Sequence, residues 1–314
     1  MLAVITEDKN IKVVERDIPS GNGELIRVTS SGICGSDLHM IEHGLVRVVL
    51  GHEFGGYTED GRLVAVRPTG ACGNCPQCKT HLSQLCSDAM FRSHGISQDG
   101  GLAEFVRVDA DRLFELPASA DPSSVGLVEP LAVVLHGINK ISLATGSRAL
   151  VVGAGSIGLL AAAVLKYRGV NVDIVARHQH QFEAAERLGV AAVQNAGTNY
   201  DASLDAVCTQ QSFDTCIAAT RPGGLLLEFG MFWSPVTLSN PMLLKEITVV
   251  PSIFYGHTHE HHDFKEAVDM LTRVSDIANA LITHHFPLAD AAEAFRTASD
   301  RKTGAIKVHL HTSL

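Results

Sequence analysis

The sequence predicts an α/β protein of two domains, one of them built on a doubly wound parallel sheet. The chain has 314 residues, enough for two hydrophobic cores. A short apolar run over residues 149–152 is followed by closely spaced glycines and an apolar helical pattern, as at the start of such a sheet. Four of the seven cysteines fall in one short segment, from Cys72 to Cys86, and predict a metal-stabilised region outside that sheet.

The composition limits the kinds of partner. Hydrophobic residues make up 46% of the chain, charged residues 19%, and the formal net charge is -9. An acidic chain without long Lys/Arg runs lacks the basic face that nucleic acids and anionic membranes attract. The apolar run in the opening MLAVITEDKN is too short for a signal peptide, and no stretch reaches the roughly 18 apolar residues of a membrane span. We therefore expect a cytoplasmic protein with no nucleic-acid or membrane partner.

The cysteine-rich segment has the pattern C-x2-C-x2-C-x7-C, formed by Cys72, Cys75, Cys78 and Cys86. Two-residue gaps let neighbouring thiolates turn toward one centre, and the fourth thiolate completes a tetrahedron. A thioredoxin-like redox pair needs only two cysteines, whereas an iron–sulfur centre is chemically possible. The spacing and a reducing compartment favour a closed structural zinc site.

The glycine-rich segment RALVVGAGSIGLLAAAVLKYRG predicts a dinucleotide-binding turn of the Rossmann type. Residues 149–152 form a strand and residues 159–167 a helix, and a second strand follows at 170–176. Glycines in G-x-G-x-x-G make the turn, admit the pyrophosphate and let strand and helix pack closely, with the phosphates at the helix N-terminus. The residues predicted to bind the dinucleotide here are Gly153, Gly155, Ser156, Ile157 and Gly158.

The end of the second strand indicates which dinucleotide binds. NAD enzymes usually carry Asp or Glu about 20 residues after the glycines, to hold the ribose 2′-hydroxyl. That place falls near Ala176, and Arg177 and His178 follow directly. A missing acid beside an arginine suits a 2′-phosphate. We therefore expect these three residues to contact the cofactor, with NADP(H) preferred over NAD(H); the alternative is that Arg177 is only a solvated surface charge.

The remaining elements of the nucleotide half follow from shorter patterns. Strands are expected at 204–208, 224–230 and 247–254, a helix at 213–219, and a further helix at 264–271. Cys208 and Cys216 are expected to be core thiols, on sheet and helix respectively. The region 195–202 lacks one strand–helix unit that a nucleotide-binding domain would normally carry.

Three further motifs offer ligands for a second metal. They are GICGSDLH at 32–39, LGHEFGG at 50–56 and VEPLAVVLHG at 128–137. One thiolate, one imidazole and several carboxylates suit a zinc site with an open position. Spacing alone does not show that Glu129 meets Cys34 and His52.

Taken together, these motifs resemble the zinc-dependent medium-chain alcohol dehydrogenase family over nearly the full chain. The G-I-C-G-S-D-L-H loop, the G-H-E box, the four-cysteine lobe, the E-P-L segment and G-A-G-S-I-G occur in the family's order, and the closing ITHHFPLADAAEAFRTASDRKTGAIKV is also similar. The resemblance implies a β-rich, GroES-like catalytic domain over residues 1–130, completed by 258–314. A Rossmann domain would fill residues 131–257.

The resemblance also implies site residues. Cys34 and His52 would bind a catalytic zinc, with a third ligand at Glu129, where alcohol dehydrogenases with a Cys2His site carry Cys. That exchange resembles the polyol, sugar and threonine dehydrogenase branches, in which the glutamate beside the histidine, here Glu53, can also ligate. Cys72, Cys75, Cys78 and Cys86 match the family's structural zinc lobe, so two zinc ions per chain are implied.

The implied chemistry is hydride transfer between a secondary alcohol or polyol, or its ketone, and NADP(H). Asp37 would orient His52, Ser36 would take the substrate proton, and His39 would pass it outward. The partner would be a small alcohol or carbonyl compound, and we expect a homodimer or homotetramer. The alternatives are an NAD-dependent polyol or threonine-type dehydrogenase and a non-catalytic nucleotide-binding protein with a structural zinc. The two departures from the family are the shortened stretch 53–71 and the strand–helix unit missing near residues 195–202.

Overall fold

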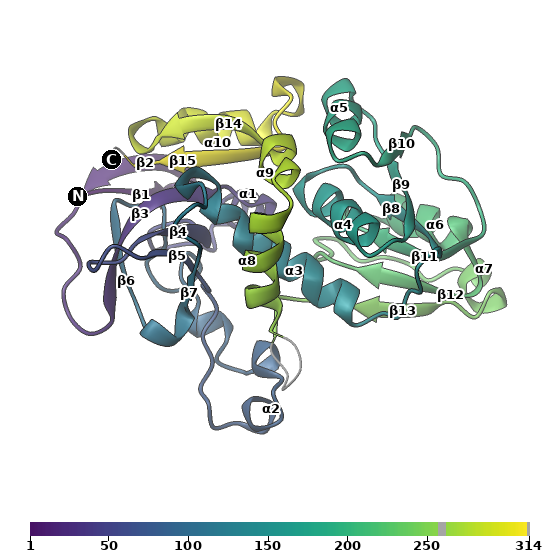
Figure 1. Cartoon of the computed structure of the whole chain (residues 1–314), viewed down its shortest axis with the longest axis horizontal. Helices are drawn as coiled ribbons and strands as arrows, with labels where there is room; N and C mark the ends of the chain where they lie inside the picture. Colours follow the sequence, from purple (N-terminus) through teal and green to yellow (C-terminus); the bar gives the residue numbers. More distant parts are fainter. Residues whose placement is uncertain (257–261, 313–314) are drawn as a thin grey trace. The chain divides into compact units, whose positions relative to one another are not determined.

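The computed structural model describes residues 1–256 and 262–312 of the chain (Figure 1). Its contacts divide into two compact units. Unit 1 comprises Met1–Glu129 with Gly256–Leu314, and unit 2 comprises Pro130–Tyr255. The first predicted domain boundary, after residue 130, falls one residue later than this division, and the second, between 257 and 258, lies outside the described residues.

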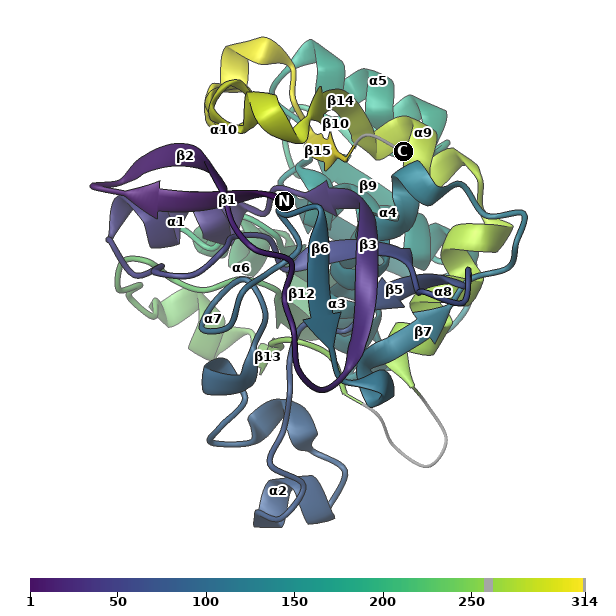
Figure 2. The ribbon, with the colours of Figure 1, turned by 90° about the vertical axis from the view of Figure 1, so that its left-hand side faces the viewer.

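Unit 1 is built on a seven-stranded sheet in which the last strands of the chain lie beside an early one. Its order is β14 (Ile282–Pro287), β15 (Lys307–His311), β3 (Glu24–Gly32), β4 (Glu53–Tyr57), β5 (Leu63–Val66) and β7 (Leu113–Glu115), with β6 (Phe105–Val108) also paired to β3. β1 (Leu2–Glu7) and β2 (Asn10–Glu15) form a separate hairpin. Figure 2 shows β6 alongside β3, and the lobe that carries α2 (Pro76–Lys79) extending below the strands.

The core of this sheet follows the two-residue period of its strands. Successive side chains on a strand point to opposite faces, so alternate residues share one face. The buried cluster accordingly takes alternate residues from β3, β5 and β6 and adds one from β4: Ile26, Val28, Phe54, Val64, Val66, Val106 and Val108. Burying each such side chain contributes about 1.5–3 kcal/mol. Within the stretch 53–71, β4 and β5 are joined by a tight turn in which the backbone N–H of Thr58 donates to Arg62 O.

The helices of unit 1 lie on this framework. They are α1 (Gly35–Glu42), α2, α8 (Asp263–Arg273), α9 (Asp276–Leu281) and α10 (Ala291–Ser299), and α3 (Val128–Asn139) begins in this unit. α8 includes the helix predicted at 264–271. Its buried residues Phe264, Ala267 and Leu271 recur at helical spacing, and Phe264 packs on Phe114 of β7 with ring centroids 4.8 Å apart.

Unit 2 is a six-stranded parallel sheet with helices, as predicted. Its order is β10 (Ala191–Val193), β9 (Asn171–Val175), β8 (Arg148–Val152), β11 (Tyr200–Asp205), β12 (Thr220–Glu228) and β13 (Thr248–Pro251). The helices are α4 (Ser156–Tyr167), α5 (Gln179–Arg187), α6 (Gln210–Ala219) and α7 (Asn240–Leu244). Numbered from β8, the strand order is 3-2-1-4-5-6, the Rossmann order, and the predicted fold class is confirmed.

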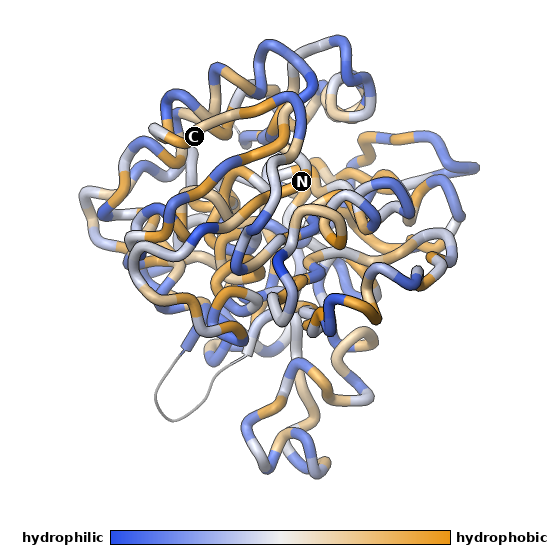
Figure 3. Tube along the Cα trace, turned by 90° about the vertical axis from the view of Figure 1, so that its right-hand side faces the viewer, coloured by the Kyte–Doolittle hydropathy of each residue, from blue (hydrophilic) through white to orange (hydrophobic). Residues whose placement is uncertain are grey.

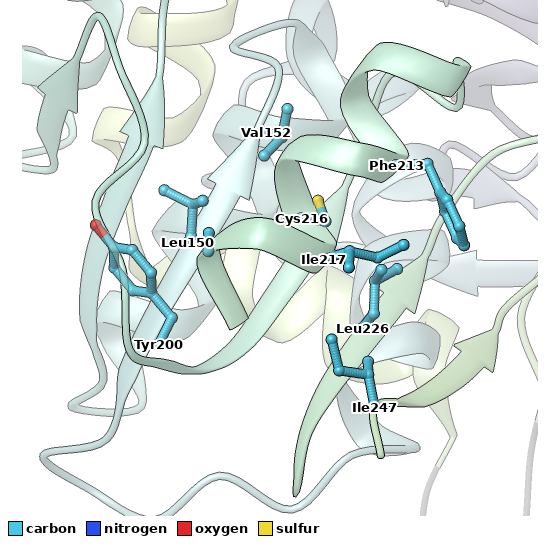
Figure 4. Packing of buried hydrophobic residues seen from close by; sticks show 9 residues of the cluster. Leu150, Val152, Tyr200, Phe213, Cys216, Ile217, Leu226 and Ile247 are labelled. Atoms are coloured by element: carbon cyan, nitrogen blue, oxygen red, sulfur yellow. The ribbon is translucent and has the colours of Figure 1, made fainter. Parts of the chain in front are cut away.

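The core under α6 shows why this helix packs where it does. Figure 4 shows Phe213, Cys216 and Ile217 of α6 among strand residues that include Leu150 and Leu226. Cys216 is fully buried, which confirms the predicted core thiol. Figure 3 shows hydrophobic and hydrophilic stretches alternating along the trace. None of the described helices is both long and apolar enough to cross a membrane.

Three predictions about unit 2 are wrong at least in part. The strand predicted at 204–208 spans Tyr200–Asp205 and ends because the Asp205 carboxylate accepts the backbone N–H groups of Val207 and Cys208, which turns the chain. Cys208 is buried but lies in this turn, with φ 57°, and not on the sheet. The region predicted to lack a strand–helix unit lacks only the helix: all six strands are present, and the described residues 194–199 contain no helix.

Candidate metal and cofactor sites

The four clustered cysteines converge as a tetrahedral site requires. The four Sγ atoms all lie within 4.8 Å of one another; they belong to Cys72, Cys75, Cys78 and Cys86. A tetrahedral zinc with Zn–S bonds of about 2.3 Å separates its sulfurs by about 3.8 Å. The Sγ–Sγ distances are 3.4 Å for Cys75–Cys78 and 3.9 Å for Cys72–Cys78. This donor set therefore fits a closed zinc site.

Backbone N–H groups around this lobe point at sulfur. The N–H groups of Asn74 and Cys75 lie 3.4 and 3.3 Å from Cys72 Sγ, and that of Asp88 lies 3.4 Å from Cys86 Sγ. Such donors favour the thiolate over the thiol. They lower the pKa of Cys72 to about 6, whereas burial and the neighbouring sulfurs raise the pKa of Cys78 to about 12. These backbone donors thus favour the thiolate form of Cys72, which is the form that binds a metal.

A second cluster lies where β3 and β4 end side by side. Gly32, the last residue of β3, pairs with Glu53, the first residue of β4. Cys34 follows β3 and caps the N-terminus of α1, and His52 directly precedes β4. Ligating atoms of Cys34, His52 and Glu53 all lie within 4.8 Å of one another. Local strand pairing therefore brings together three of the four residues predicted to hold the catalytic zinc.

Asp37 and Ser36 fix the histidine of this cluster. Asp37 is fully buried; its Oδ2 accepts the backbone N–H of Cys34, and its Oδ1 lies 3.1 Å from His52 Nδ1. Ser36 Oγ lies 3.3 Å from the other ring nitrogen, Nε2. Burial lowers the pKa of His52, but Asp37 and Cys34 outweigh that effect and raise the pKa well above its usual value. With Nδ1 held by Asp37, Nε2 is the nitrogen left to bind a metal.

Lys307 is a site residue that the sequence analysis missed. Its Nζ lies 2.8 and 2.7 Å from the two carboxylate oxygens of Glu53 and donates to Ile33 O at 3.1 Å. The Lys307 and Glu53 side chains are 2% and 1% exposed. Lys307 comes from β15, which pairs with β3, and its place in the alternating pattern of GAIKVHLH looks like an ordinary strand position. Only the long-range pairing of β15 shows that this lysine faces inward.

Glu129 lies nearby but does not join the cluster. It stands in the first turn of α3, is buried, and is not among the residues whose ligating atoms lie within 4.8 Å of one another. Burial raises the pKa of Glu129 to about 8, with His52 acting to lower it and Glu53 to raise it. The structure therefore presents two glutamates for one metal: Glu53, paired with Lys307, and Glu129, which favours its protonated form.

His39 occupies the exposed side of α1. It lies three residues after Ser36 on the same helix, and its side chain is 46% exposed. Its Nδ1 lies 3.9 Å from Glu42 Oε2. An imidazole with this exposure can exchange protons with water.

The dinucleotide turn has the shape that its glycines predict. Gly153 has φ 102°, a conformation that favours glycine, and a Cβ at Gly158 would lie 1.8 Å from Gly153 O. A Cβ at Gly155 would meet nothing within 4 Å, so the turn is open beside this residue. Gly155 caps α4, and Ser156 and Ile157 form the first turn of that helix. Open space at a helix N-terminus fits a pyrophosphate.

The residues after β9 differ in exposure. Ala176 is buried and its backbone N–H donates to Val193 O. Arg177 is exposed and donates to Gln211 Oε1 at 3.3 Å. His178 caps α5 and stacks on His180 with ring centroids 5.5 Å apart. Asp173, the nearby acid of β9, accepts from Tyr200 at 2.6 Å and is thereby engaged within the sheet. The end of β9 thus presents the exposed cation of Arg177, whereas the carboxylate of Asp173 is hydrogen-bonded to Tyr200.

Comparison with known proteins agrees with this arrangement. The family described as alcohol dehydrogenase GroES-like domain matches residues 21–118, and the family described as zinc-binding dehydrogenase matches residues 156–273. L-galactonate-5-dehydrogenase of Escherichia coli (strain K12) is 30% identical, over 90% of this chain and 89% of its own. L-idonate 5-dehydrogenase (NAD(P)(+)) of the same organism is 29% identical, over 98% and 97%.

A solved structure gives the same result for the fold. A zinc-binding dehydrogenase from Sinorhizobium meliloti 1021 bound to NADP superposes with a TM-score of 0.87 at 26% identity, covering 99% of this chain and 98% of the other. The chain therefore belongs to the zinc-dependent medium-chain alcohol dehydrogenase family. This confirms the family expected from the sequence motifs.

Proposed function

We propose that this chain is a zinc-dependent oxidoreductase that transfers a hydride between NADP(H) and a secondary alcohol or polyol, or the corresponding ketone. Residues 1–130 and 258–314 are its catalytic domain, and residues 131–257 bind the dinucleotide. The observation that carries the proposal is the convergence of Cys34, His52 and Glu53 in a chain of this family. A thiolate, an imidazole and a carboxylate leave one tetrahedral position for a substrate oxygen.

Cys34, His52 and a carboxylate would hold the catalytic zinc. The carboxylate would come from Glu53, which is now paired with Lys307, or from the buried Glu129 in its deprotonated form. Zinc, when bound, supplies a Lewis acid for the substrate oxygen, and the nicotinamide donates or accepts the hydride.

The chain's own residues manage the proton. Ser36 would accept the proton of the substrate hydroxyl while releasing its own hydroxyl proton toward His39, because its Oγ lies on the Nε2 side of His52, where a metal would bind. His39, half-exposed on the same helix, passes that proton to water. Asp37 keeps His52 oriented through Nδ1.

The substrate is a small polyhydroxy compound with a secondary hydroxyl. Support comes from the relatives named for L-galactonate and L-idonate, which match this chain over nine-tenths of its length or more.

NADP(H) is preferred over NAD(H). The support is the pair Ala176 and Arg177, since alanine cannot hold a ribose hydroxyl and arginine suits a 2′-phosphate. The Sinorhizobium meliloti structure holds NADP, whereas the name of the L-idonate enzyme gives both dinucleotides.

A structural zinc at Cys72, Cys75, Cys78 and Cys86 accompanies the catalytic one, so these two sites hold two ions per chain. The protein acts in the cytoplasm as a homodimer or homotetramer.

Elemental analysis of zinc in the wild type and in Cys34→Ser, together with polyol assays using NADPH and NADH, tests the proposal. We expect the variant to contain one zinc per chain fewer and to lose polyol oxidation and ketone reduction. Equal zinc content in Cys34→Ser and the wild type would contradict the proposal and favour a non-catalytic nucleotide-binding protein. Faster turnover of the wild type with NADH than with NADPH would establish the NAD-dependent alternative.

A further inference from the structure

A third group of metal-type side chains lies in unit 2, on the strands next to the dinucleotide turn, and shares no residue with the sites assigned above. Asp205 ends β11, Glu228 ends β12, and the two residues are direct partners in the parallel register of these strands (Figure 1). Cys208 lies three residues after Asp205, in the turn before α6. The carboxyl ends of neighbouring parallel strands meet at one edge of a sheet, where ligands commonly bind.

These three side chains are buried together without a counter-charge. Asp205, Glu228 and Cys208 are 0%, 3% and 7% exposed, and one ligand atom from each lies within 4.8 Å of the others. Among the residues that the structure describes, no lysine, arginine or histidine forms an ion pair or hydrogen bond with either carboxylate. Buried carboxylates are normally paired or bound to a metal.

Each carboxylate also has an oxygen to which nothing donates. Asp205 Oδ1 accepts the backbone N–H groups of Val207 and Cys208 at 2.8 and 2.9 Å, and Glu228 Oε2 lies 3.6 Å from Cys208 Sγ. Asp205 Oδ2 and Glu228 Oε1 are buried and have no hydrogen-bond partner. Leaving such an atom unsatisfied costs about 1–3 kcal/mol. Two such oxygen atoms in one cluster indicate that a metal cation binds there.

The spacing suits a zinc-type cation. With bonds of about 2.3 Å to sulfur and about 2.1 Å to oxygen, a tetrahedral zinc holds these two atoms about 3.6 Å apart. The distance from Cys208 Sγ to Glu228 Oε2 is 3.6 Å. A Cβ at residue 230 would lie 2.6 Å from this sulfur, so Gly230 leaves room for it. Val207, between Asp205 and Cys208, is 44% exposed, so solvent reaches the turn.

We propose that Asp205, Cys208 and Glu228 form an additional site for a zinc-type divalent cation, with water completing the coordination. This proposal does not depend on the proposed function. The competing interpretation is a neutral cluster in which the Cys208 thiol donates to Glu228. Burial and the nearby Asp205 raise the pKa of Glu228 to about 8, which is compatible with that cluster when no metal is present. The neutral cluster needs at least one protonated carboxyl group, whereas a cation pairs with both carboxylates in their charged form.

The test counts tight zinc equivalents per full-length chain by competition with a chromophoric chelator. The variants are Cys208→Ser and Glu228→Gln, the second nearly isosteric, and the matched control is Cys216→Ser, a neighbouring buried thiol outside the group. We expect the two site variants to bind one equivalent fewer than the wild type and the control to bind the same number. Equal stoichiometry in Glu228→Gln and the wild type overturns the proposal, even if Cys208→Ser fails to fold.

Cadmium-113 NMR separates this site from the others. We expect a one-thiolate signal in the cadmium-substituted protein that disappears in Cys208→Ser or Glu228→Gln and persists in Cys34→Ser. A spectrum in which every one-thiolate signal disappears in Cys34→Ser would also overturn the proposal. Loss of the Cys34-dependent signal alone concerns the proposed catalytic zinc, so the two failures are distinguishable.

Discussion

The buried pair of Lys307 and Glu53 makes a quantitative prediction. Replacing Lys307 by Met keeps most of the aliphatic stem and removes the charge that neutralises Glu53. The carboxylate then remains 1% exposed with neither of its two Nζ contacts, and Ile33 O loses its donor as well. We expect Lys307→Met to lower the free energy of unfolding of unit 1.

The size of the effect follows from the distances. Opposite charges 2.7–2.8 Å apart attract by about 6 kcal/mol at an effective dielectric constant of about 20. Part of that attraction only offsets the desolvation of both groups, so removing one partner of a buried pair costs about 3–5 kcal/mol. The double variant Lys307→Met/Glu53→Gln removes the stranded charge and should recover most of the loss.

Hydrogen–deuterium exchange of the β3 and β15 amides measures this cost as the free energy of local opening. Lys302→Met, an exposed lysine of the same region, is the matched control and should change it by less than about 0.5 kcal/mol. Because a released Glu53 can bind zinc, each variant is measured both zinc-loaded and chelator-treated. A loss below about 1 kcal/mol in both conditions would refute the reasoning.

Three further predictions concern other parts of the chain. Ala176→Asp should lower kcat/KM for NADPH roughly ten- to hundredfold and leave kcat/KM for NADH unchanged, because a carboxylate repels the 2′-phosphate. Steady-state kinetics that show equal effects on both cofactors would contradict this prediction. Cys75→Ser should remove one zinc equivalent and expose residues 72–86 to proteolysis, whereas Cys216→Ser should leave the cleavage pattern of that lobe unchanged. Burial and then the Lys307 charge lower the pKa of His309 to about 3. The pKa of His309 in the unfolded chain is near 6.5. The stabilisation from holding His309 neutral in the fold is therefore present above pH 6.5 and is lost as the pH falls toward 3. Between pH 6.5 and 5, the free energy of unfolding decreases by about 1.5 kcal/mol. Urea unfolding at pH 6.5 and pH 5 should show a smaller loss of stability in His309→Gln than in the wild type. An equal loss in both proteins would show that His309 is not the group responsible.

The features that the sequence predicted well are local ones. The cysteine lobe and the glycine turn each fall within a short segment, so spacing alone constrains their geometry. The Cys34 and His52 cluster needed the family resemblance as well, because strand pairing brings its members together.

The features that the sequence did not predict depend on contacts between distant residues. Lys307 reaches Glu53 across 254 positions. The start of β11 was placed four residues late because polar residues interrupt its beginning: Ser203 accepts from Thr220 Oγ1 at 2.8 Å, and Asp201 binds Arg221 at 2.8 Å. Polar residues that satisfy one another across neighbouring strands hide a buried strand from a search for apolar runs.

The pairing of β15 with β3 also sets an order of events during synthesis. A ribosome adds about 5–20 residues per second, and domains generally fold as they emerge. Unit 2 is one continuous stretch, Pro130–Tyr255, and has all its strands well before residues 307–311 are made. Until then, residues 30–32 of β3 have no β15 partner and the Glu53 carboxylate has no lysine. The nascent chain thus has a complete unit 2 while part of one strand edge in unit 1 is still unpaired. That edge is the surface a chaperone would have to protect.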